Sequence, residues 1–100
     1  MPTLTVGVAH SLSQEEATER LKHEFHSAKD RYEKQVSDLE GEWDGHGMNF
    51  RFTTFGMKIA GTVTSEPSQV RVDAKLPLAA MVFRGAIERQ IRDELGKVLA

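Results

Sequence analysis

Residues 48–75 read MNFRFTTFGMKIAGTVTSEPSQVRVDAK, and this stretch decides the fold. Apolar and polar side chains alternate through three segments, which are separated by Gly56 and by a turn at residues 66–68. An alternation of period two gives each segment one apolar and one polar face, as in half-buried β-strands. Because short connections join antiparallel strands, we predict an antiparallel meander of three strands.

Two segments before the meander are also predicted to be strands. Residues 3–8 alternate in the same way, and residues 39–43 form a short strand that leads toward the meander. The intervening sequence Asp-Gly-His-Gly at residues 44–47 is a turn, in which we expect both glycines to adopt positive φ angles. The sheet is thus expected to contain five strands.

Helical periodicity appears twice. Ser13 and Glu16 have the spacing of a capping box, so a helix is predicted to begin near Ser13. Its apolar stripe consists of Ala17, Leu21, Phe25, Ala28, Tyr32 and Val36. A second helix is predicted from about Ala79, just after Pro77, to the C-terminus. Its stripe consists of Phe83, Ile87, Ile91, Leu95 and Val98.

The predicted fold class is α+β, in one domain over residues 1–100, with the element order β-α-β-β-β-β-α. A sheet with one apolar face and two amphipathic helices favours a two-layer sandwich, with both helices on the same face. The other face is then mostly polar. It carries Arg51, Thr53, Lys58, Thr62, Arg71, Asp73 and Lys75, with Phe55 and Ala60 as apolar exceptions.

Composition narrows the classes of function. The formal net charge is −2, so there is no basic excess for nucleic acid, and the chain has no cysteine for disulfides or thiolate chemistry. We predict no signal peptide and no transmembrane segment, because the longest apolar run spans only residues 76–83. These features fit a cytoplasmic protein.

The four histidines are weak candidates for chemistry. His23 and His26 are three residues apart on the first helix, but zinc needs three or four ligands, so we predict solvated side chains and no metal. His46 is expected to be exposed at a hairpin tip, with a functional role as the alternative. His10 is expected to form local hydrogen bonds at the start of the helix. No serine lies in a nucleophile elbow, so we predict neither an enzyme nor a cofactor.

The most unusual segment is LPLAAMVF at residues 76–83, which has no charge over eight residues. On an ideal helix Val82 points away from the apolar stripe, and Arg84 lies at its edge, where it could pair with Glu88. Either this segment fills the end of the core, or it leaves apolar surface for a partner. The candidate interaction surface consists of Leu76, Leu78, Met81, Val82, Phe83 and Arg84.

Three groups of residues resemble a small bacterial family, the putative polyhydroxyalkanoic acid system (granule-region) proteins. The first is HSLS at residues 10–13, followed by Glu16 and Ala17. The second is Trp43 with the Asp-Gly turn after it, and the third is FRGAIE at residues 83–88, followed by Ile91 and Leu95. Most of these are capping, turn and packing residues, so they indicate a fold family rather than a reaction.

The resemblance implies association with storage-polyester synthesis or granules, without an agreed biochemical activity. The first hypothesis is therefore a non-enzymatic, granule-associated protein that acts through contact with a protein or the polymer surface. Its candidate partners are a second copy of the chain, as a homodimer, and the polyhydroxyalkanoate granule or its proteins. The alternative is a binder of small apolar, lipid-like ligands with a helix-grip-like fold, which would need a dimer to enclose a cavity.

Overall fold

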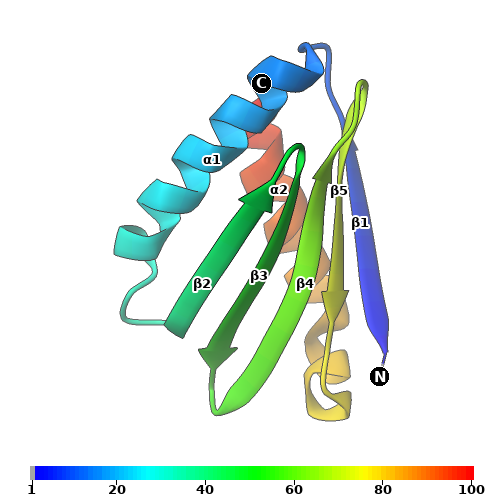
Figure 1. The fold of residues 1–100 in the computed structure, drawn as a ribbon. Helices are drawn as coiled ribbons and strands as arrows, with labels where there is room; N and C mark the ends of the chain where they lie inside the picture. The colour runs from blue at the N-terminus through cyan, green and yellow to red at the C-terminus, as the bar shows by residue number, and fades with distance from the viewer. Residues whose placement is uncertain (1) are drawn as a thin grey trace.

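The five strands form one antiparallel sheet in the computed structural model, which describes residues 2–100 (Figure 1). They are β1 (Thr3–Ala9), β2 (Ser37–Asp44), β3 (Gly47–Thr54), β4 (Met57–Ser65) and β5 (Gln69–Lys75). The spatial order is β1-β5-β4-β3-β2, so the helix between β1 and β2 carries the chain from one edge of the sheet to the other. The predicted α+β fold class and element order are confirmed.

The core lies on one face of this sheet, where the alternating apolar side chains meet across strands. Val72 of β5 is the register partner of both Val6 and Val63, and Met48 is the partner of Val63. All four side chains are buried. This row crosses four strands, and each member removes apolar surface from water, which is the main stabilising term in folding.

Helix α1 (Gln14–Arg31) begins where the capping pattern predicts. The Ser13 hydroxyl accepts a hydrogen bond from the Glu16 amide (3.1 Å) and thereby satisfies one free donor of the first turn. The helix ends at Arg31, so the prediction of one stripe reaching Val36 was too long. The amides of Gln35 and Val36 both donate to the Tyr32 carbonyl, which closes a turn that leads the chain into β2.

The C-terminal helix is not continuous from Ala79, as predicted. A 3-10 helix, η1 (Leu78–Phe83), precedes α2 (Arg84–Leu99). Pro77 starts it, because its carbonyl accepts a hydrogen bond from the Ala80 amide three residues on (2.9 Å). Phe83 is the last residue of η1 and precedes α2 in a non-helical cap conformation, and it is exposed rather than part of the predicted buried stripe.

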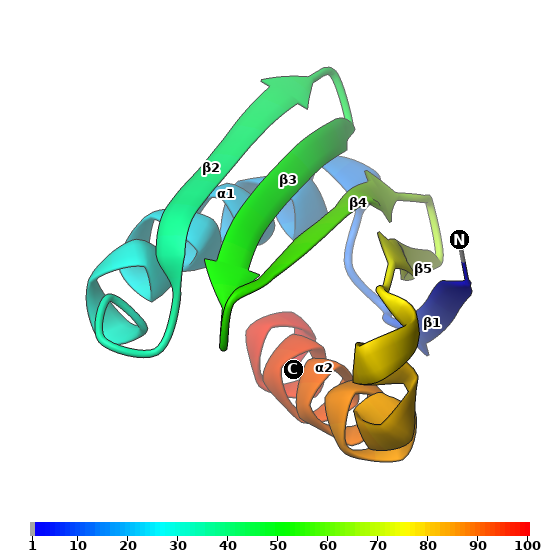
Figure 2. The same ribbon diagram turned by 90° about the horizontal axis from the view of Figure 1, so that it is seen from below.

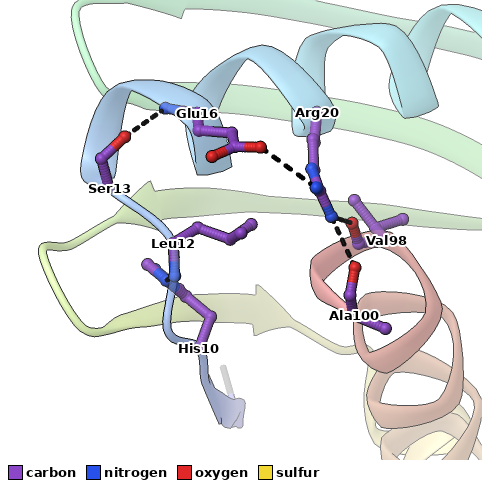
Figure 3. Close-up of polar contacts among 7 residues, drawn as sticks. All are labelled: His10, Leu12, Ser13, Glu16, Arg20, Val98 and Ala100. Atoms are coloured by element: carbon purple, nitrogen blue, oxygen red, sulfur yellow. Dashed lines mark hydrogen bonds and ion pairs between the residues drawn. The ribbon is translucent and has the colours of Figure 1, made fainter.

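Both helices lie on the same side of the curved sheet, as Figure 2 shows, and they contact each other. The Arg20 guanidinium of α1 donates to the carbonyl oxygens of Val98 (3.2 Å) and Ala100 (2.6 Å) at the end of α2, and it also pairs with Glu16 (Figure 3). Carbonyls in the last turn of a helix lack partners within the helix. Arg20 therefore caps α2 from the neighbouring helix.

Two glycines allow aromatic rings to lie directly on the inner face of the sheet. A Cβ atom at Gly41 would lie 2.5 Å from Cζ of Phe25, and one at Gly61 would lie 2.8 Å from Cζ of Phe50. Real Cβ contacts are not this short. The lack of a side chain at Gly41 makes room for the Phe25 ring of α1, and the lack of one at Gly61 makes room for the Phe50 ring of β3.

Candidate functional site

The uncharged segment at residues 76–83 both fills the core and exposes apolar surface. Leu76 and Ala80 are buried, so they fix the segment to the end of the sheet. By contrast, Leu78 is 78% exposed, Val82 is 82% exposed and Phe83 is 59% exposed. These two sets alternate along the short helix. The three exposed side chains are consequently presented by a backbone that the other two hold in place.

The other two candidate residues are Met81, inside η1, and Arg84, the first residue of α2. Met81 is partly buried and packs against the core. Arg84 is exposed beside β1, where it lines a shallow hollow together with Thr3 and Thr5. The expected ion pair of Arg84 with Glu88 is not formed, because Glu88 pairs instead with Arg92, one turn further along α2 (3.7 Å).

A fourth exposed apolar side chain, Phe55, was noted in the sequence only as an exception on the outer face. Phe55 and Gly56 form the two-residue turn between β3 and β4, and Thr54 pairs with Met57 across it. Their φ angles are +50° and +74°, which correspond to a type I′ turn. The Phe55 side chain is 93% exposed. An aromatic residue where such turns favour Asn, Asp or Gly was the available signal.

Phe55 and η1 lie at the same end of the molecule, far apart in sequence. In Figure 1 the β3–β4 turn and η1 both form the lower end, and Figure 2 views this end from below. We call Phe55, Leu78, Val82 and Phe83 together the apolar end. The four side chains form two separate exposed apolar sites, the hairpin tip and η1, at one end of the domain.

Three basic side chains near the apolar end lack an acidic partner within the described chain. Lys58, Lys75 and Arg84 form no ion pair within residues 2–100. The fourth basic side chain of residues 45–65 and 74–87, Arg51, is paired with Glu40, and Glu88 lines the same hollow as Arg84. The apolar end thus presents these three cations, with acidic side chains nearby.

His46 lies at the opposite end and is not the exposed tip residue that we predicted. The Thr18 hydroxyl donates to the Gln14 carbonyl (2.8 Å), so it accepts the hydrogen bond from Nδ1 of His46 (2.7 Å). His46 is half-buried by this contact between the β2–β3 turn and α1. In that turn Gly45 has a positive φ (+63°), whereas Gly47 does not, so only one of the two glycines plays the expected role.

His10 forms the local hydrogen bonds that we expected at the start of α1. Its Nδ1 accepts from the Leu12 amide (3.1 Å), so Nε2 carries the proton and donates to the Glu66 carbonyl (3.2 Å). Figure 3 shows His10 and Leu12 beside the Ser13 cap. The ring therefore ties the β1–α1 connection to the β4–β5 turn, and both of its nitrogens are used in doing so.

The remaining polar candidates are isolated from one another. His23 and His26 are exposed on α1, and within residues 2–100 no three His, Asp or Glu side chains are grouped so that they could hold a metal ion. Ser65 is buried, and its hydroxyl donates to the Gln14 carbonyl (3.5 Å). The structure places none of these side chains at the apolar end.

The outer face of the sheet is polar, as predicted. A shallow open hollow of about 590 Å³ is lined by residues of β2, β3, β4 and β5 and by Lys29 of α1. Arg51 at its margin forms an ion pair with Glu40, whereas Lys75 on the other side forms none within the described chain. The arrangement lacks a buried polar group that would fix a ligand.

Comparison with known proteins gives one finding. The sequence matches the family described as "Putative polyhydroxyalkanoic acid system protein" over residues 4–99. No curated protein and no solved structure matches the chain. Within residues 2–100 no helix has the length and apolar character needed to cross a membrane. Since the match covers nearly every residue of the domain, the chain belongs to the family of putative polyhydroxyalkanoic acid system proteins.

Proposed function

We propose that this chain is a non-enzymatic protein of the polyhydroxyalkanoate system, which acts at storage granules in the cytoplasm through contact with a protein or with the polymer surface. The family match supports the link to the polyhydroxyalkanoate system. The observation that carries the mode of action is the exposure of Leu78, Val82 and Phe83 on a short helix that the core holds in place.

The size of this surface suits reversible contact. Full burial of one Leu, Val or Phe side chain contributes about 1.5–3 kcal/mol. Three such side chains already face solvent on η1, so a partner gains this energy without first unfolding any part of the domain. Since Leu76 and Ala80 fix the backbone, little conformational entropy is lost when the surface is covered.

The alternative hypothesis of a small apolar ligand has less support. It requires an enclosed cavity between the sheet and the helices, whereas the two hollows described above are shallow and open, one along β2 to β5 with Lys29 and the other between β1 and the start of α2. Native mass spectrometry of the purified protein would test it. A lipid-like adduct that stays bound after gel filtration would favour the ligand hypothesis over surface contact.

The proposed function is tested by fractionating bacteria that accumulate polyhydroxyalkanoate and express this chain. We expect the wild type in the granule fraction and the double variant Leu78→Ser/Val82→Ser in the supernatant. Both side chains are exposed, so the variant should keep the thermal stability of the wild type. The matched control is Ala79→Ser/Ala86→Ser, which changes exposed small residues nearby and should stay with the granules. Wild type found wholly in the supernatant would refute the proposal.

A further inference from the structure

The two-residue hairpin requires a positive φ at Phe55, but folding does not explain why a phenylalanine stands there. A non-glycine residue in the left-handed region is destabilised by about 1–2 kcal/mol relative to the right-handed one. Phe55 adopts this conformation at φ +50°, and its almost fully exposed ring contributes nothing to either core cluster. Backbone strain that persists without local compensation is more often found at functional sites than elsewhere. The aromatic ring is thus the feature that needs a partner.

The apolar end consists of projecting side chains rather than the walls of a groove. None of Phe55, Leu78, Val82 and Phe83 lines either hollow of the domain. Leu78 is the first residue of η1, Val82 and Phe83 are its last two, and Phe55 stands at the tip of a hairpin. Separate projecting side chains can insert into a deformable surface, whereas a folded protein partner would need matching pockets.

The charges beside these side chains indicate the sign of that surface. Lys58 follows Phe55 by three residues, Arg84 follows Phe83 directly, and Lys75 ends the strand that leads into η1. All three are free of ion pairs within the described residues. Cations next to exposed apolar side chains complement an anionic lipid surface, where apolar groups enter the acyl chains and cations contact phosphate headgroups.

We propose that the apolar end docks on an anionic phospholipid surface, with Phe55 and η1 as two separate anchors. The inference rests on the proposed function, because it uses the same end of the domain and names the chemistry of what it contacts. It adds the β3–β4 turn to the contact surface. It also makes the contact dependent on charge, which contact with a neutral polyester would not be.

The test measures binding to vesicles of phosphatidylcholine alone and of phosphatidylcholine mixed with phosphatidylglycerol. We expect the wild type to bind only the mixed vesicles, and less at high ionic strength. The variant Phe55→Asn should bind about tenfold more weakly, because one buried aromatic side chain is lost. Asn is favoured in this turn, so the melting temperature should rise. A loss of binding together with a gain in stability cannot result from unfolding.

A second pair of variants tests the charges. Each Lys near an anionic membrane raises the binding constant about fivefold, so the double variant Lys58→Gln/Lys75→Gln should bind roughly 25-fold more weakly. The control Lys22→Gln/Lys97→Gln removes two exposed cations, one in the first half of α1 and one in the last turn of α2, and should bind as the wild type does. Equal binding of both double variants, equal binding to both kinds of vesicle, or unchanged binding by Phe55→Asn would each overturn the inference.

Two parallel measurements separate this inference from the proposed function. Binding of the same variants to polyhydroxyalkanoate particles without lipid shows whether polymer alone suffices. If the protein binds the particles but no vesicles, the lipid inference fails and the proposed function stands. Sedimentation of the wild type and Phe55→Asn addresses a second copy of the chain. If the wild type is a dimer and the variant a monomer, the apolar end is a self-interface and the lipid inference is overturned.

Discussion

The substitution Gly61→Ala should strongly destabilise the domain, because β4 crosses beneath an aromatic ring at this position. The new Cβ atom would lie 2.8 Å from Cζ of Phe50 and 2.9 Å from Cα of Ala74, and it would also clash with the carbonyl oxygen of Asp73. The ring can move, but the two backbone atoms belong to the paired strand β5 and cannot move without opening the sheet.

Overpacking of a core lowers the free energy of unfolding by about 1–3 kcal/mol. Because the new Cβ atom clashes with backbone, we expect a loss of about 3 kcal/mol for this variant. For a domain of this length the melting temperature should then fall by roughly 15 °C. Urea unfolding followed by the fluorescence of Trp43 measures the free energy directly. The matched control is Gly96→Ala, where nothing lies within 4 Å of the new Cβ. This exposed position is inside α2, so Ala should stabilise the domain by about 1 kcal/mol.

The double variant Gly61→Ala/Phe50→Leu identifies the obstacle. Leu at position 50 removes the ring, but the clash of the new Cβ atom with the β5 backbone remains. We therefore expect the double variant to recover only part of the lost unfolding free energy, and the smaller side chain at position 50 reduces this recovery further. Full recovery would mean that the ring alone needs the glycine. A Gly61→Ala variant as stable as the wild type would refute the close packing of β3, β4 and β5 described above.

Three further predictions concern single contacts. Arg20→Met leaves the carbonyls of Val98 and Ala100 without their donor, so we expect a loss of about 1–2 kcal/mol in unfolding free energy and faster amide exchange at the end of α2. His46→Ala removes the hydrogen bond to the buried Thr18 hydroxyl and should cost about 1 kcal/mol by urea unfolding. Phe55→Asn should raise the unfolding free energy by about 1 kcal/mol, and a decrease would show that the ring has a structural role.

Strands β1, β3, β4 and β5 could be predicted from the sequence because each contains buried residues on one face, so an alternation is visible along the chain, whereas the edge strand β2 has no buried residue. The start of α1 was predictable for a similar reason, since the Ser13 cap is a local contact. The role of Gly61 was not predictable, because the obstacle to a side chain is a ring on one neighbouring strand and backbone on the other. No periodicity along the chain encodes such a contact.

Of the candidate site, the segment at residues 76–83 could be predicted from the sequence, whereas the contribution of Phe55 could not. The uncharged run at residues 76–83 indicated an exposed surface, but helical periodicity assigned Phe83 to the buried stripe. In the structure α2 begins only at Arg84, and Phe83 precedes it in a non-helical cap conformation, so helical periodicity does not apply to Phe83. Phe55 was missed for a different reason. Strand alternation placed it on the outer sheet face, whereas it lies in the turn, which only the tertiary structure brings to the same end as η1.

The residues that carry the family resemblance separate into two kinds once their contacts are known. His10, Leu12 and Ser13 form the hydrogen bonds that connect β1 to α1, and Leu95 is buried in the core, so folding alone accounts for them. Phe83 belongs to the same set but is more than half exposed. A phenylalanine that faces water contributes little to folding, so its presence requires another cause. The proposed docking of the apolar end would account for it, because Phe83 is exposed at the end of η1 and lies next to Arg84 in the sequence.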